Sequence, residues 1–107
     1  MTTVDTSCRT SPLVPMSDES AQQTARTFKA LGDPVRIKLL SLIAASPEQE
    51  ACICDLTAPV GLSQGTVSHH MKILTEAGFV TREQRGKWAY FGIARAGFAY
   101  AQQALDI

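Results

Sequence analysis

The stretch from Glu50 to Leu74, EACICDLTAPVGLSQGTVSHHMKIL, predicts two helices separated by a short turn. Pro59 has no backbone N–H and disfavours helical geometry at the residue before it, so we expect the first helix to end at Ala58. Ser63 is a favourable N-cap for the second helix. Two helices joined by a tight turn form a helix-turn-helix, whose second helix can lie in the major groove of DNA.

The second helix of this stretch has one apolar face and one polar face. At about 100° per residue, Val67, Met71 and Leu74 fall together on the apolar face. The opposite face is small, polar and mildly basic, which suits contact with base edges and phosphates, and Glu76 is the only acid on the helix. The predicted DNA contacts on this helix and its cap are Ser63, Gln64, Thr66, Ser68, His69 and Lys72.

These two helices resemble a known family. Residues 52–56, CICDL, and residues 63–74, SQGTVSHHMKIL, are similar to the ELCVCDL-like and SQ-x-TVSHHLK-x-L segments of the ArsR/SmtB metalloregulators. Residues 28–36, FKALGDPVR, are similar to the family's entry into its second helix. The resemblance extends from about residue 20 to residue 100 and implies a dimeric repressor of the arsenic-responsive branch, with a winged helix-turn-helix fold.

The size and composition are those of one globular domain. The chain has 107 residues, of which 45% are hydrophobic and 19% charged. No apolar run approaches the roughly 20 residues that span a bilayer, and the N-terminal segment lacks the charged-then-apolar order of a signal peptide. We therefore expect a cytoplasmic protein with no membrane partner.

The net charge is zero, but the charges are unevenly distributed along the chain. Residues 62–97 contain five bases and two acids, whereas residues 46–61 contain three acids and no base. A basic surface beside an acidic one fits a protein that contacts double-stranded DNA on one side. A dimer would double the number of phosphate contacts.

Two segments are expected along the chain. Residues 1–16 are predicted to form a flexible arm, and residues 17–107 one winged helix-turn-helix domain that is mostly α with a small β-hairpin. Ser17 is the predicted N-cap of the first helix, and Asp33 followed by Pro34 begins the second. The first helix is expected to have an apolar stripe formed by Ala25, Phe28 and Leu31. The buried side expected on the second helix consists of Val35, Leu39, Leu42 and Ile43, widened by Ile37 and Leu40.

A hairpin is predicted after the helix-turn-helix. Residues 79–84 and 87–91 have strand-like composition and are separated by Arg85-Gly86, a turn that glycine permits. A basic hairpin beside a helix-turn-helix is a wing, so Arg85 and Lys87 are predicted to contact phosphate or the minor groove. The hairpin aromatics expected in the core, rather than stacked on bases, are Trp88 and Phe91.

The last predicted helix, from about Arg95 to Ala104, is rich in alanine and has an apolar side. Together with the helix that follows Ser17, it is the predicted interface of a homodimer. Two-fold pairing would place two recognition helices about one duplex turn apart, matching a palindromic operator.

The chain has three cysteines, Cys8, Cys52 and Cys54. A structural disulfide framework is not expected in a reducing compartment, which leaves buried thiols, a soft-metal site or a redox switch. On a regular helix the side chains of Cys52 and Cys54 would point about 200° apart. Both could bind one ion only if the first helical turn is absent or distorted. Core packing is the alternative, because free cysteine is among the most buried residue types.

The resemblance adds a candidate ligand set. The arsenic sensors of the family have a third cysteine three residues beyond the pair, where this chain has Thr57. Some members recruit an N-terminal thiol, so the resemblance implies metal ligands Cys8, Cys52 and Cys54, with Cys8 supplied by the same subunit or by its partner. Three thiolates without a fourth ligand favour As(III) over tetrahedral zinc, while Sb(III), Cd(II) and Pb(II) stay open. The family's second type of metal site uses Asp and His on the last helix, where this chain has only Asp106.

The expected mechanism is derepression, in which the apo dimer binds operator DNA and As(III) at the thiolates weakens that binding. His69 is predicted to face outward toward phosphate, and His70 to be half-buried and hydrogen-bonded; neither is expected to bind metal. The alternatives are a repressor switched by a disulfide among the cysteines and a constitutive DNA-binding protein with inert thiols. The chain has no evident Cys–His–acid group or cofactor loop, so an enzyme is not expected.

Overall fold

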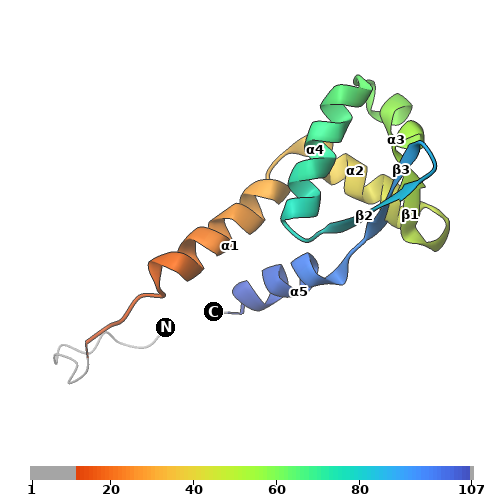
Figure 1. Ribbon diagram of the computed structural model, residues 1–107. Coiled ribbons are helices and arrows are strands. Elements are labelled where there is room, and N and C mark those ends of the chain that lie inside the picture. The colour runs from red at the N-terminus through yellow and green to blue at the C-terminus, as the bar shows by residue number, and fades with distance from the viewer. Residues whose placement is uncertain (1–11, 107) are drawn as a thin grey trace.

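The computed structural model describes residues 12–106, and the predictions for the N-terminal arm and for Cys8 lie outside these residues. The described chain is mostly helical with one small sheet, as predicted. In chain order the described residues form α1 (Asp18–Leu31), α2 (Pro34–Ala45), the 3₁₀ turn η1 (Pro47–Gln49), β1 (Glu50–Cys52), α3 (Ile53–Val60), α4 (Gln64–Glu76), β2 (Val80–Arg85), β3 (Trp88–Ile93) and α5 (Arg95–Ala104), with the helices and strands labelled in Figure 1.

The sheet has three antiparallel strands in the order β1-β3-β2, so the predicted two-stranded hairpin was incomplete. β1 is three residues long and pairs Glu50 with Gly92 and Cys52 with Tyr90. Three residues are too few to show the alternation that indicates a strand, and the sequence was interpreted there as the start of a helix. The hairpin turn also differs by one residue: Arg85 pairs with Trp88, and Gly86 and Lys87 form the turn.

The three predicted N-caps are confirmed. The Ser17 hydroxyl accepts from the Ser20 N–H at 3.1 Å, and the Ser63 hydroxyl accepts from the Thr66 N–H at 3.2 Å. Asp33 Oδ1 accepts from the N–H groups of the next helix's first turn, at 2.8 Å from Val35. These contacts satisfy backbone donors that have no partner inside the helix.

The prediction that the helix before the recognition helix ends at Ala58 is wrong. α3 continues through Pro59 to Val60 and ends at Gly61, which adopts the left-handed conformation at φ 69°. The Gly61 N–H donates to the carbonyls of Thr57 and Ala58, both at 3.1 Å. Because Pro59 lies in the last turn, its missing N–H removes only one helical hydrogen bond, and the left-handed glycine completes the end of the helix.

The core lies between α2, α3, α4 and the sheet. Val67, Met71 and Leu74 of α4 are fully buried, as predicted. Ile37 is 49% exposed, so its predicted burial was wrong for the single chain. Of the hairpin aromatics, Phe91 is buried as expected, whereas Trp88 is 41% exposed. The other fully buried large side chains are Leu39, Ile43, Leu56 and Phe79.

Figure 1 shows α1 and α5 running side by side away from the body that the other elements form. The Thr24 and Tyr100 hydroxyls are 3.0 Å apart and join the two helices. The start of α5 is fixed against the turn after α4, where the Gly97 N–H donates to the Gly78 carbonyl at 2.8 Å. A Cβ at position 97 would lie 2.7 Å from that carbonyl, so glycine allows this close approach. Within residues 12–106, none of the helices is both long and apolar enough to cross a membrane.

The Asp33 cap makes a prediction for stability against pH. Partial burial raises the pKa of Asp33, but the backbone donors of Val35 and Arg36 and the charge of Arg36 outweigh it, so the net pKa is lowered. A carboxylate with a lowered folded-state pKa contributes stability above its unfolded pKa of about 3.9, and this contribution is lost as the pH falls through the folded value. Asp33→Asn should therefore lower the Tm at pH 7 and match the parent at the lowest pH, as measured by thermal unfolding from pH 2 to pH 7. Asp106→Asn, which changes an exposed carboxylate, should leave the Tm difference near zero throughout.

Candidate nucleic-acid interface and cysteine site

The polar face of α4 is open to solvent. Gln64, Ser68, His69 and Lys72 are all exposed, while the opposite side of the helix lies in the core. The hydroxyl groups of Ser63 and Thr66 are already hydrogen-bonded to each other, since Ser63 donates to Thr66 Oγ1 at 3.0 Å. The Ser63 hydroxyl also caps the helix by accepting from the Thr66 N–H. The structure thus brings the predicted contacts of this helix together on one surface.

A groove of about 500 Å³ separates the polar face of α4 from the hairpin β2–β3. From α4 it is lined by Gln64, Ser68 and Lys72, and from the hairpin by Arg82, Lys87 and Trp88. Three cations and one carboxylate, that of Glu76, therefore line a common space between the recognition helix and the wing, and this excess of positive charge favours a phosphate backbone there. We use the name "wing groove" for this space.

Arg82 and Trp88 of the hairpin line the wing groove but were not among the predicted DNA contacts. Arg82 is directly opposite Phe91 in the sheet and therefore shares its side, the one that faces α4. The sequence could have indicated this side for Arg82, because side chains two residues apart on a strand share a side and Val80, at the start of β2, is buried. Trp88 was assigned to the core because aromatics on a hairpin usually pack there, but it lies beside the turn where no helix covers it.

Arg85 is placed differently from the other predicted wing contacts. Its guanidinium donates to both carboxylate oxygens of Glu50, at 2.8 and 3.0 Å, and to Glu83 at 2.7 Å, and it lies 4.5 Å from the centre of the Tyr90 ring. The hydrogen bond from Arg85 lowers the pKa of Glu50, and these two carboxylates raise the pKa of Arg85. The guanidinium is thus held by protein carboxylates, whereas Lys87 is exposed in the turn itself.

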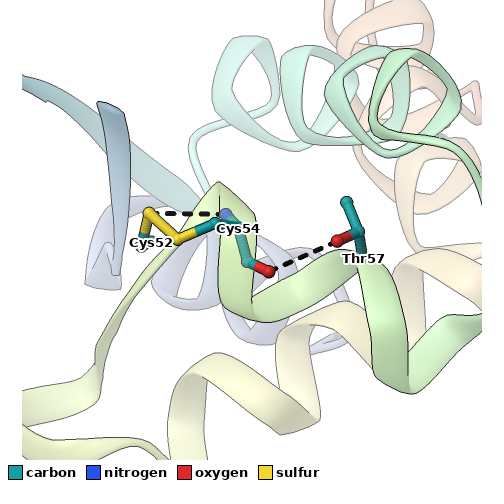
Figure 2. Close-up of a disulfide and its surroundings, with 3 residues drawn as sticks. All are labelled: Cys52, Cys54 and Thr57. Atoms are coloured by element: carbon teal, nitrogen blue, oxygen red, sulfur yellow. Dashed lines mark hydrogen bonds between the residues drawn. A yellow bond between two sulfur atoms is a disulfide. The ribbon is translucent and has the colours of Figure 1, made fainter. Parts of the chain in front are cut away.

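The two described cysteines converge at the N-terminus of α3. Cys52 is the last residue of β1 and the N-cap of α3, and its Sγ accepts from the Cys54 N–H at 3.3 Å. The two sulfurs are joined as a disulfide, with Cα atoms 5.2 Å apart, as Figure 2 shows. The expected divergence of about 200° does not occur, because Cys52 has extended geometry and lies outside the helix. Cys52 is buried and Cys54 is exposed, so the pair connects the core to the surface.

Thr57, the position of the missing third cysteine, lies one turn along α3 from Cys54. Its hydroxyl donates to the Cys54 carbonyl at 3.3 Å (Figure 2). Residues 12–106 contain no group of three His, Cys, Asp or Glu side chains that could hold a metal ion. A third sulfur ligand would therefore have to come from Cys8 of the same subunit or of its partner.

His70 is half-buried and hydrogen-bonded, as predicted, and His69 is exposed. Arg36 Nη1 lies 3.1 Å from His70 Nδ1, and because a guanidinium can only donate, Nδ1 is the acceptor. Arg36 also donates through Nε to the Ala30 carbonyl at 2.6 Å and through Nη2 to the Lys29 carbonyl. This arginine therefore joins α4 to the C-terminus of α1, one of the two helices proposed for the dimer interface.

An exposed polar recognition helix, a preceding short helix and a basic hairpin beside them define the class of winged helix-turn-helix transcriptional regulators. The model of the family "Bacterial regulatory protein, arsR family" matches residues 33–82. A staphylococcal relative, the arsenical resistance operon repressor of Staphylococcus xylosus, is 34% identical over 88 residues, which cover 82% of each protein. The chain belongs to the ArsR family.

Two further comparisons agree with this assignment. A transcriptional repressor SmtB homolog of Synechocystis is 40% identical over 79 residues, and the chain spans 58% of the length of that relative. The solution structure of a homodimeric winged helix-turn-helix DNA-binding domain from Mycobacterium bovis, a possible ArsR-family regulator, superposes with a TM-score of 0.64 at 29% identity. The superposition covers 87% of this chain and 85% of that one. The family consists of DNA-binding transcriptional regulators and is not a class of enzymes.

Proposed function

We propose that this protein is an arsenite-responsive repressor that binds operator DNA as a homodimer and is released when As(III) binds the thiolates of Cys8, Cys52 and Cys54. The observation that carries the proposal is the convergence of the Cys52 and Cys54 sulfurs at the start of α3 (Figure 2). α3 is the first helix of the helix-turn-helix and packs against the recognition helix α4. A ligand bound there acts close to the DNA-reading surface.

The donor set suits a soft, thiophilic ion. Cysteine thiolates select such ions over hard cations, and three thiolates match the pyramidal coordination of As(III). Cys54 is exposed, so an incoming ion can reach the pair once both cysteines are reduced. Sb(III), Cd(II) and Pb(II) share this preference for sulfur. A comparison of how strongly each of the four ions weakens operator binding would identify the inducer.

The coupling to DNA passes through the cap of α3. Cys52 Sγ caps this helix by accepting from the Cys54 N–H, and a sulfur bound to an ion has less electron density to offer that donor. Leu56 of α3 and Val67 of α4 are both buried in the same core, so a displaced α3 also displaces α4. By linkage, DNA must weaken arsenite binding by the same factor by which arsenite weakens DNA binding.

The proposed DNA contacts combine the recognition helix with the wing. The bound duplex would place base edges against the polar face of α4 and backbone phosphates in the wing groove. Pairing through α1 and α5 would present two such surfaces to the half-sites of a palindromic operator. The residues proposed to contact DNA are Ser63, Gln64, Thr66, Ser68, His69, Lys72, Arg85 and Lys87.

X-ray absorption of the arsenite-loaded, reduced protein tests the ligand set by counting sulfur neighbours. We expect three sulfurs around arsenic in the parent and two in Cys8→Ser. Because Thr57 lies one turn beyond Cys54, the double variant Cys8→Ser/Thr57→Cys should recover the third sulfur. Three sulfurs in Cys8→Ser alone would exclude Cys8 as a ligand, and an arsenic without sulfur neighbours in the parent would refute the sensor.

The disulfide between Cys52 and Cys54 favours a second candidate, a thiol-based redox-sensing repressor. Two thiols would lose two electrons and two protons to an oxidant such as hydrogen peroxide, which is reduced to water. This switch needs no third sulfur. Release from DNA by peroxide that persists in Cys8→Ser, with no release by arsenite in the reduced parent, would favour it over the arsenite sensor.

A further inference from the structure

We propose that Glu50 is an intramolecular competitor of DNA phosphate for Arg85, and that it makes the phosphate affinity of the wing depend on the strand that carries Cys52. The first part concerns DNA binding alone. The second part rests on the proposed arsenite response. The residues that carry the argument lie on one side of the sheet and come from all three strands: Glu50, Glu83, Arg85 and Tyr90.

Arg85 reaches across the whole sheet. It lies at the end of β2, yet it pairs with Glu50 on β1, the strand at the opposite edge. Its guanidinium passes over the Tyr90 ring of the central strand β3 on the way. Because strand side chains alternate, these side chains occupy the side of the sheet opposite to Arg82. An arginine of the wing is therefore turned toward the cysteine-bearing edge of the sheet.

The interaction with Glu50 is well suited to exchange with phosphate. Two guanidinium nitrogens contact the two carboxylate oxygens, a bidentate geometry that a phosphate group reproduces. Both side chains remain substantially exposed, 41% for Arg85 and 37% for Glu50, and exposed ion pairs are weak enough to be broken by a competing anion. A duplex beside the wing supplies such anions at high local concentration.

The competitor Glu50 and one member of the cysteine pair, Cys52, lie on the same strand. Glu50 and Cys52 are the first and last residues of β1, and Cys52 lies directly opposite Tyr90 in the sheet. Tyr90 in turn supports the Arg85 guanidinium. A change of the cysteine pair that shifts β1 therefore moves Glu50 and its neighbour Tyr90, two of the three groups that contact Arg85, the third being Glu83 of β2. In the structure, with the two sulfurs joined, Glu50 holds the guanidinium.

The test is Glu50→Gln in the full-length protein, with binding to an operator duplex selected by the parent and measured in salt titrations without arsenite. Removing the bidentate carboxylate of Glu50, which leaves Arg85 with its contact to Glu83, should tighten binding by about two- to fivefold for each protomer. The plot of log affinity against log salt should steepen by about 0.9 for every phosphate that Arg85 engages. Glu48→Gln is the matched control, because it removes the same charge from an exposed side chain that forms no ion pair within residues 12–106.

A double-mutant cycle identifies Arg85 as the group released. In an Arg85→Gln background, Glu50→Gln should no longer change affinity or salt slope beyond the Glu48→Gln control. Equal effects of Glu50→Gln and Glu48→Gln, or an effect that persists without Arg85, would overturn the proposal. Arsenite should weaken operator binding by a smaller factor in Glu50→Gln than in the parent. An equal factor in the two proteins would refute the link to β1. If arsenite does not change the operator affinity of the parent, the sensor proposal fails. The arsenite-free comparison of Glu50→Gln with Glu48→Gln still tests whether Glu50 competes with phosphate for Arg85.

Discussion

Arsenite is expected to weaken operator binding by the reduced parent about 5- to 150-fold, and to leave binding by Cys54→Ser unchanged. Cys54 is the exposed member of the pair, and its thiolate is the group that an incoming ion meets first. Serine keeps the size and the backbone N–H that donates to Cys52 Sγ, but its hydroxyl is a hard, weakly acidic ligand. The measurement is fluorescence anisotropy of a labelled operator duplex, titrated with protein at several arsenite concentrations.

Two controls separate the loss of sensing from the loss of folding. Without arsenite, Cys54→Ser should bind the operator as tightly as the parent, because the side chain lies outside the core and the polar face of α4. Thr57→Ser keeps the hydroxyl that donates to the Cys54 carbonyl and should keep the full arsenite response. A Cys54→Ser protein that arsenite still releases from DNA would show that the sensing thiols lie elsewhere.

The helices of the fold could be predicted because their signals are local. Ser17, Asp33 and Ser63 each cap the helix that follows them, and such capping depends only on residues within one turn. The periodicity of Val67, Met71 and Leu74 likewise fixes which side of α4 lies in the core, and hence which side is free for DNA. This local information was sufficient to predict the helix-turn-helix and which polar side chains of its second helix are exposed.

The missed features depend on contacts between distant segments. β1 exists because Glu50, Ala51 and Cys52 pair with β3, some 40 residues later, and three residues have no recognisable period of their own. The same pairing places Glu50 within reach of Arg85, so the sequence could assign Arg85 a positive charge but not its partner. Trp88 was misassigned because its exposure depends on which elements cover the hairpin.

The sequence indicated a candidate pair of cysteines but not the geometry that brings their sulfurs together. The C-x-C spacing and its position before the recognition helix singled out Cys52 and Cys54 as candidate ligands. The calculated divergence of about 200° assumed a helix through both residues, whereas the strand β1 ends at Cys52 and the helix begins one residue later. That strand-to-helix junction lets the two sulfurs meet. The role of Cys8 stays a prediction, because it lies outside the described residues.

Gln64→Ala is expected to weaken binding to the cognate operator by about 1–3 kcal/mol at each half-site, so that a dimer loses the effect twice. Gln64 is the first residue of α4, is exposed, and lines the wing groove. In helix-turn-helix proteins the N-terminal residues of the recognition helix contact base edges, and a glutamine amide can form two hydrogen bonds with adenine. Competition titrations with cognate and scrambled duplexes measure the specificity directly.

Lys72→Ala provides the contrast that distinguishes base reading from phosphate binding. Lys72 lies two turns further along the same face, where an ammonium group contributes charge without sequence preference. Its loss should weaken binding to cognate and scrambled duplexes alike and reduce the salt slope by about 0.9 per phosphate, whereas Gln64→Ala should change only the cognate affinity. Both variants should keep the parent's Tm, since neither side chain is buried. If Gln64→Ala discriminates between the two duplexes as well as the parent does, Gln64 does not read the operator, and the specificity must come from other residues of α4 or from the wing.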